Sequence, residues 1–221
     1  MTDFASEREE MVERQLKGRG ITEPEILDAF RAVPREAFIS EEYAHLAYGD
    51  HPLPIEANQT ISQPYIVALM IEAAQIQSGD NVLEVGAGSG YAAAVISRIA
   101  HNVIGIERQH DLVDVSQERL KRLGYDNVEI VEGDGTRGWP ESAPFDAILA
   151  AASGSHVPQP LLDQLSDGGR LVMPIGDEHA TQRLVRLVRS AADRFDETDL
   201  GGVMFVPLVG AQGWNDARDG D

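Results

Sequence analysis

A glycine-rich segment preceded by an acidic residue is the part of this sequence with the most specific chemistry: Glu84-Val85-Gly86-Ala87-Gly88-Ser89-Gly90-Tyr91. It follows a predicted strand and opens a predicted helix, which is the context of a ligand-binding turn. Gly86, Gly88 and Gly90 permit backbone angles that other residues avoid, and they let a ligand approach the main chain. The spacing is G-x-G-x-G, and Glu84 would repel a pyrophosphate. The segment therefore favours a ligand with an ammonium group and no phosphate; a tight turn without a ligand is the alternative.

Two more acidic residues stand near the ends of the next two predicted strands. Glu107 is placed to accept hydrogen bonds from ribose hydroxyls, as in nucleotide-binding sheets, or else to act as a charge partner of the following helix. Asp134 lies between two glycines and either accepts from an adenine amine or forms a simple turn. Together the three sites describe S-adenosylmethionine (SAM), an adenosyl ligand with a cationic tail. The residues predicted to bind it are Glu84, Gly86, Gly88, Ser89, Gly90, Glu107, Asp134 and Gly135.

Alternating strands and helices must bring these residues to one edge of a sheet. From residue 81 onward, short apolar runs typical of buried strands alternate with helical segments, which predicts an α/β, Rossmann-like, mostly parallel sheet of seven strands with right-handed crossovers. Its last two strands have no helix between them and predict an antiparallel edge hairpin. The strands are expected at Asn81–Val85, Asn102–Ile106, Val128–Val131, Phe145–Ala150, Gly169–Pro174, Arg183–Arg189 and Val203–Val209, and the helices at Tyr91–Ala100, Asp111–Leu123 and Pro158–Leu165.

The residues before the sheet are predicted to be helical, with one ordered loop. A helix is expected from Thr22, as its N-cap, to just before Pro34. Residues 50–63 are predicted to form an extended loop, and Pro64 to start another helix. We expect a single domain over 1–221, with an N-terminal helical segment and loop (1–78), a ligand-binding core (79–210) and an acidic tail (211–221).

The composition argues against several classes of function. The chain has 221 residues, a net charge of −19 and no cysteine, which excludes a disulfide framework, a thiolate metal site and a Cys nucleophile. The negative charge opposes nucleic-acid binding, no apolar run is long enough to span a membrane, and the six histidines form no metal-ligand pair. We expect no metal and a cytoplasmic location. Most of the charge is expected on the surface, either for solubility or as an adaptation to salt.

From about residue 7 to 210 the sequence resembles the protein-L-isoaspartate O-methyltransferase family, which belongs to the class I SAM-dependent methyltransferases. The most diagnostic match is Gln59-Thr60-Ile61-Ser62-Gln63-Pro64-Tyr65, because all methyltransferases of this class share the glycine turn. Other matching segments are Val33-Pro34-Arg35-Glu36-Ala37-Phe38, Ala47-Tyr48-Gly49-Asp50, Pro52-Leu53-Pro54-Ile55, Gly133-Asp134-Gly135, Gly138-Trp139-Pro140, Gly168-Gly169-Arg170-Leu171-Val172 and Phe205-Val206-Pro207-Leu208.

The resemblance implies a repair enzyme, and we expect it to be a monomer. It would transfer the SAM methyl group to the free α-carboxyl of L-isoaspartyl residues in damaged proteins and peptides, and release S-adenosyl-L-homocysteine. The methyl ester then collapses through a succinimide, and part of it returns to aspartate. The resemblance also implies an acceptor site made of Thr60, Ile61, Ser62, Pro64, Val206 and Pro207. Ser62 would be its catalytic hydroxyl, although a helix N-cap is another interpretation. A carboxylate acceptor is already ionised at pH 7, so the reaction needs no strong base.

One departure from the family pattern lies directly before the diagnostic segment. Glu56-Ala57-Asn58 replaces the usual Gly-x-Gly, which should stiffen or redirect the loop and adds a negative charge near an anionic acceptor. Two alternatives therefore stay open: a SAM-dependent methyltransferase with a different small-molecule or protein acceptor, and a SAM-binding module without catalysis. An NAD-dependent oxidoreductase is disfavoured by the glycine spacing and by the hairpin ending.

Overall fold

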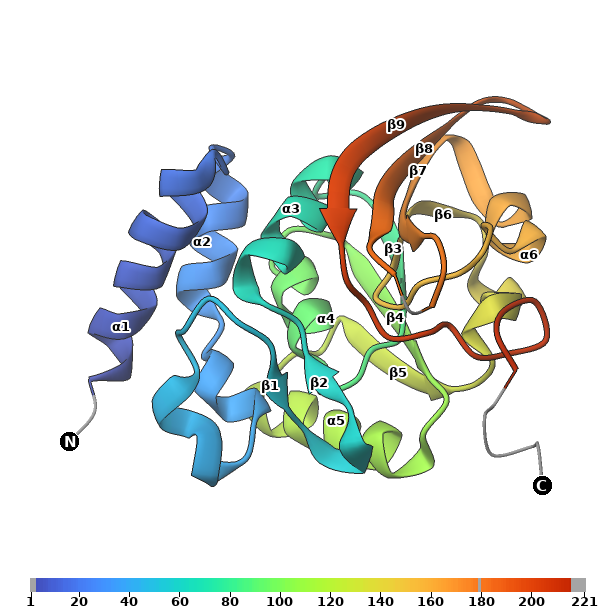
Figure 1. Ribbon diagram of the computed structural model, residues 1–221. Coiled ribbons are helices and arrows are strands. Elements are labelled where there is room, and N and C mark those ends of the chain that lie inside the picture. The colour runs from blue at the N-terminus through green and yellow to red at the C-terminus, as the bar shows by residue number, and fades with distance from the viewer. Residues whose placement is uncertain (1–2, 179, 216–221) are drawn as a thin grey trace.

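A seven-stranded sheet forms the centre of the molecule in the computed structural model, which describes residues 3–178 and 180–215 (Figure 1). The strand order is β5-β4-β3-β6-β7-β8-β9; β3 to β7 run parallel to one another, and β8 is antiparallel to both β7 and β9. The strands are β3 (Asn81–Val85), β4 (Asn102–Glu107), β5 (Val128–Glu132), β6 (Phe145–Ala150), β7 (Leu165–Ile175), β8 (Gln182–Ala191) and β9 (Arg194–Val203). The expected mostly parallel sheet with an antiparallel edge hairpin is confirmed.

The chain order reverses at β3, which pairs with β4 on one side and with β6 on the other. In open parallel sheets, a crevice at the carboxyl ends of the strands forms at such a reversal and binds ligands. The glycine-rich segment follows β3 directly, so the topology places it at this crevice.

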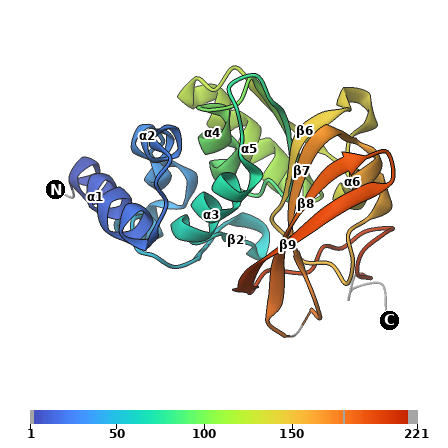
Figure 2. The ribbon, with the colours of Figure 1, turned by 90° about the horizontal axis from the view of Figure 1, so that it is seen from above.

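Helices cover both faces of the sheet (Figure 2). Figure 2 shows α3 (Pro64–Ala74), α4 (Tyr91–Ser97) and α5 (His110–Leu123) on one side and α6 (Gln159–Asp163) on the other. Along β3, Val82 packs in the core that contains α3 and α4, whereas Leu83 and Val85 pack in the core that contains α6. Because side chains alternate between the faces of a strand, Glu84 lies on the same face as Val82, toward α3 and α4.

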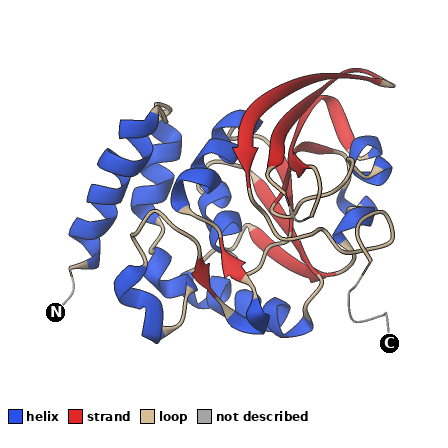
Figure 3. Ribbon diagram, in the orientation of Figure 1, coloured by secondary structure: helices blue, strands red, loops and turns tan. Residues whose placement is uncertain are grey.

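The N-terminal residues are mostly helical and add a further layer outside α3 and α4 (Figure 3). Helix α1 (Phe4–Glu10) continues through a π-helical stretch (Met11–Leu16) and a short 3-10 helix (Lys17–Arg19), and α2 (Pro24–Ala32) follows. Two more 3-10 helices (Arg35–Phe38 and Glu41–Leu46) lead to a two-stranded ribbon of β1 (Leu53–Pro54) and β2 (Thr60–Ile61). The remaining 3-10 helices are Glu56–Asn58, Gly135–Arg137 and Pro140–Ser142.

Several element boundaries differ from the predictions; β7, for example, begins at Leu165 rather than at Gly169. The last strand is Arg194–Val203, not Val203–Val209, because β9 is an edge strand whose charged residues hide the apolar alternation. The segment predicted as a strand contains Pro207, which has no N–H to donate, and makes only isolated bridges. The N-cap of α2 is Glu23 rather than Thr22, and α4 ends at Ser97, three residues before its predicted end. No helix within the described residues is long and apolar enough to cross a membrane.

Candidate active site

A cavity of about 300 Å³ lies at the carboxyl ends of β3, β4 and β6. It brings together most of the predicted ligand-binding and acceptor residues, although these come from distant parts of the chain. The predicted residues that line it are Thr60, Ile61, Ser62, Glu84, Gly86, Gly88, Ser89, Glu107, Gly135, Val206 and Pro207. Gly90, Asp134 and Pro64 are not among the lining residues. Asn58, Gln59, Gln109 and Ala151 also line it, although they were not among the predicted site residues.

The glycine turn has the backbone geometry that its sequence predicts. Gly86, Gly88 and Gly90 all have positive φ angles, of 85°, 54° and 83°. Gly86 and Ala87 donate their N–H groups to the carbonyl of Ile106 (2.9 and 3.0 Å), which ties the turn to the end of β4. Gly90 caps α4 and serves packing, because a Cβ there would lie 3.2 Å from the Leu120 side chain.

Glu107 is buried and held in place by three backbone N–H groups. Its Oε2 accepts from Gly88 (2.9 Å), and its Oε1 accepts from Arg108 (2.8 Å) and Gln109 (3.0 Å). A carboxylate offers about four lone-pair positions, so one remains for a ligand hydroxyl. The carboxylate therefore both fixes the glycine turn and presents an acceptor to the cavity.

Glu84 is a buried acid, and no cation pairs with it among the residues that the structure describes. Its side chain lines the cavity, only 2% of the residue is exposed, and its Oε2 has no hydrogen-bond partner among the described residues. Burial and the nearby charge of Glu107 raise the pKa of Glu84 to about 8. A buried carboxylate in this state fits a ligand with an ammonium group, because the ammonium would neutralise the charge and satisfy the free oxygen. The site thus fits the methionine tail of SAM.

Asp134 is used by the protein's own main chain. Its Oδ1 accepts from the backbone N–H of Thr136 (2.9 Å) and from the Thr136 hydroxyl (2.6 Å), and its Oδ2 accepts from the N–H of Ala211 (2.8 Å). Burial acts to raise the pKa of Asp134, but these hydrogen bonds outweigh it and lower the pKa. The carboxylate therefore fastens the segment after β9 to the end of β5, next to Gly135 in the cavity wall.

The predicted acceptor loop is an ordered β-ribbon. Leu53 pairs with Ile61 and Pro54 with Thr60, and the N–H of Ile55 donates to the carbonyl of Gln59 (2.9 Å). The N-cap of α3 is Gln63, so Ser62 lies one residue before the cap. Its position in the cavity wall leaves it available to a ligand.

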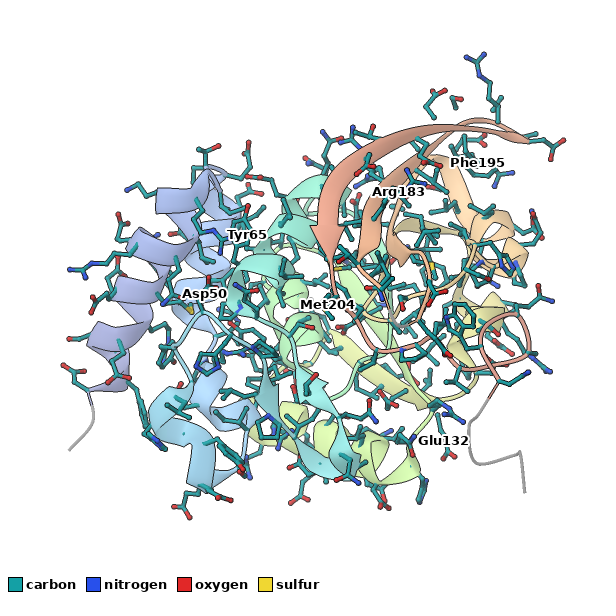
Figure 4. All side chains as sticks on the ribbon, in the orientation of Figure 1. Asp50, Tyr65, Glu132, Arg183, Phe195 and Met204 are labelled. Carbon is teal, nitrogen blue, oxygen red and sulfur yellow. The ribbon has the colours of Figure 1, made fainter. Side chains whose placement is uncertain are left out.

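The segment after β9 forms another part of the cavity wall. Ser153 is fully buried and holds this segment through two backbone hydrogen bonds of 2.8 Å, one donated to the Val206 carbonyl and one accepted from the Leu208 N–H. Val206 is 42% exposed, and Met204, labelled in Figure 4, is 80% exposed. Val206 also lines the cavity, so it presents an exposed apolar side chain there.

Arg119 is another residue near this site that was not predicted from the sequence. It lies on α5 and reaches from there to both Glu56 and the carbonyl of Ser89, each at 3.0 Å. The available signal was its helical spacing, because Arg119 shares the buried face of α5 with Leu112, Ser116 and Leu120. A charged residue on such a face needs a polar partner.

Comparisons with known proteins agree with this geometry. The family model described as protein-L-isoaspartate(D-aspartate) O-methyltransferase matches residues 6–213. A protein-L-isoaspartate O-methyltransferase of Pelobacter propionicus is 56% identical over 94% of this chain and 92% of its own. One from Rhodopseudomonas palustris is 55% identical over 92% of this chain and 94% of its own.

Two solved structures have the same architecture. One, named protein-L-isoaspartate O-methyltransferase, superimposes with a TM-score of 0.86 at 31% identity and covers 93% of this chain and 67% of its own. The other, from Plasmodium falciparum, is described as a complex with S-adenosyl-L-homocysteine; its TM-score is 0.79 at 30% identity, over 91% of this chain and 98% of its own. The match extends through the N-terminal layer, the sheet and the edge hairpin, and the chain belongs to the protein-L-isoaspartate(D-aspartate) O-methyltransferase family.

Proposed function

We propose that this chain transfers the methyl group of SAM to the free α-carboxyl of L-isoaspartyl residues in damaged proteins and peptides. The observation that carries the proposal is that one cavity is lined both by Glu84 with the glycine turn and by the Thr60–Ser62 segment. A cofactor site and an acceptor segment that share one cavity provide the proximity that a direct methyl transfer requires.

The cofactor half of the site is assigned to the residues around the glycine turn. Glu84 would pair with the ammonium of the methionine tail, and Glu107 would accept a hydrogen bond from a ribose hydroxyl. Gly86, Gly88 and Ser89 would contact the ligand along the main chain, and Gly135 would border it on the far side. When bound, SAM supplies an electrophilic methyl group on its sulfonium.

The acceptor half has to hold a carboxylate and needs no base. With SAM bound, a carboxylate oxygen of the isoaspartyl residue would form the new bond to the methyl carbon as the carbon–sulfur bond breaks, and the electron pair of that bond would stay on the sulfur of the product, S-adenosyl-L-homocysteine. The Ser62 hydroxyl would donate a hydrogen bond to the acceptor and align it. The rest of the acceptor site would be formed by Thr60, Ile61, Pro64, Val206 and Pro207.

The assembly and location of the protein also belong to the proposal. The acceptor loop, the cofactor turn and the segment after β9 all come from this one chain, which supports a single domain acting as a monomer. Its net charge of −19 disfavours nucleic acid as a substrate. We place it in the cytoplasm. Gel filtration tests the monomer.

The decisive experiment compares an isoaspartyl peptide with its normal aspartyl twin. Both are incubated with the protein and SAM labelled in the methyl group, and the transferred label is counted. The proposal expects methylation of the isoaspartyl peptide and little of its twin. Equal labelling of both would refute it, activity on small molecules alone would indicate another acceptor, and tight SAM binding without any transfer would indicate a non-catalytic module.

A further inference from the structure

The turn before the acceptor segment has a backbone conformation that its residues do not favour. Ala57 has a φ of 53° and a ψ of 29°, and Asn58 has a φ of 56°. Asparagine tolerates this left-handed region, but alanine enters it at a cost that glycine avoids. Because Gln59, Thr60 and Ser62 follow directly, the conformation of this turn sets where the acceptor segment lies. Other contacts must therefore stabilise the turn.

The Glu56 side chain makes such a contact with Arg119. The carboxylate lies 3.0 Å from Nη2 of Arg119, and the Arg119 side chain is only 8% exposed. Nη1 of the same guanidinium donates to the carbonyl of Ser89 (3.0 Å) in the glycine turn. One rigid, planar cation therefore connects the turn that precedes the acceptor segment to the turn that borders the cofactor cavity.

Helix α5, which carries Arg119, packs against the glycine turn and so holds this connection in place. A Cβ placed on Gly90 would lie 3.2 Å from the Leu120 side chain and 3.4 Å from Ser116, so α5 packs directly against the glycine turn. On the other side, a Cβ on Gly88 would lie 3.4 Å from Cδ1 of Ile55, the residue before Glu56. The two turns thus lie against each other, with Arg119 bridging them at one end.

We propose that Arg119 is a positioning residue that clamps the acceptor segment over the cofactor site through Glu56. The ion pair compensates for the missing glycines, because it stabilises a turn that Ala57 alone disfavours. The inference rests on the proposed function and deepens it, since the clamp acts on the transfer reaction. Neither Arg119 nor Glu56 touches the reacting atoms. Loss of the clamp should therefore weaken acceptor binding more than it slows methyl transfer in the bound complex.

The kinetics of clamp variants test this role. Glu56→Ala should raise KM for the isoaspartyl peptide by about fivefold to tenfold, with a smaller change in kcat, because the Glu56 carboxylate is partly exposed and its ion pair is weaker than a fully buried one. Arg119→Lys keeps the positive charge but lacks the two guanidinium nitrogens that reach Ser89 and Glu56. It should therefore raise the same KM, but by less than Glu56→Ala does. The matched control is Glu10→Ala. Glu10 pairs with Arg14 on the surface, with both side chains more than half exposed, and its removal should leave the KM unchanged.

A rescue separates positioning from a merely structural role. Ala57→Gly removes the cost of the left-handed backbone, so Glu56→Ala/Ala57→Gly should recover most of the lost peptide affinity. The binding of S-adenosyl-L-homocysteine and the melting temperature are measured on every variant.

The outcomes are distinct. A raised peptide KM that Ala57→Gly restores supports the clamp. An active protein whose KM is unchanged by Glu56→Ala overturns it, as does a lowered melting temperature with unchanged kinetics or a raised KM without rescue. Failure of the unaltered protein to prefer the isoaspartyl peptide would instead refute the proposed function.

Discussion

The raised pKa of Glu84 predicts that ligand binding releases a proton. With a pKa of about 8, about 0.9 of the free molecules carry a protonated Glu84 at pH 7, and about 0.1 at pH 9. An ammonium group against the carboxylate favours its ionised form. Binding of S-adenosyl-L-homocysteine, which has the same amino-acid tail as SAM, should therefore release close to one proton at pH 7.

The affinity for S-adenosyl-L-homocysteine should rise as the pH rises. If the ligand binds only the ionised form, its apparent Kd exceeds the intrinsic value by a factor of about 100 at pH 6, about 11 at pH 7 and about 2 at pH 8. Binding should therefore become about tenfold tighter from pH 6 to pH 7, and about fivefold tighter again to pH 8. The sign is fixed because the charged acid, not the neutral one, pairs with the ligand.

Isothermal titration calorimetry in phosphate and in Tris measures both quantities, because the two buffers take up protons with different heats. Glu84→Gln is the control: it should bind more weakly, and the proton release attributed to Glu84 should disappear. A pH-independent Kd between pH 6 and pH 8, or no proton release at pH 7, would show that Glu84 is ionised in the free protein and would refute the reasoning.

Three further predictions concern the acceptor, the fold and the charge. Ser62→Ala should lower kcat/KM for the isoaspartyl peptide by about tenfold or more, the loss of one hydrogen bond to a charged acceptor, while the Kd of S-adenosyl-L-homocysteine stays unchanged; an equal loss in both would contradict its acceptor role. Asp134→Asn weakens the bonds from Thr136 and Ala211 and should reduce the free energy of unfolding by about 1–3 kcal/mol, measured by urea denaturation; unchanged stability would mean that these bonds contribute nothing. At a net charge of −19, the melting temperature should rise between about 0.05 and 1 M NaCl, as the screening length shortens to about 3 Å; a flat or falling profile would argue against a repulsive surface.

The parallel strands were the most predictable elements of the fold. β3 and β6 have the bounds expected from their apolar runs, because strands buried on both faces consist almost entirely of apolar residues. β9 was missed for the opposite reason. It pairs with a single neighbour and is largely exposed along Phe195–Gly202, so its composition carries little information about its conformation.

In the candidate site, too, some features depend on residues close together in the chain and others on residues far apart. The positive φ angles of Gly86, Gly88 and Gly90 follow from a local motif, which a sequence displays directly. The position of Asp134 between two glycines predicted a turn or a ligand contact. In the tertiary structure the chain returns to Asp134 at Ala211, 77 residues later. Only this contact shows that backbone N–H groups donate to both oxygens of the carboxylate.

The sequence by itself determined the class of fold and the conformation of the glycine turn, and it singled out the segment proposed to bind the acceptor, because each depends on residues close together in the chain. Tertiary structure decided how their charges act. Glu84 has a raised pKa only because burial and Glu107, at the end of the neighbouring strand, disfavour its ionised form. Arg119 reaches Glu56 only because α5 packs against the glycine turn. Electrostatic and packing energies depend on distances in space, and the spacing of residues along the chain does not give those distances.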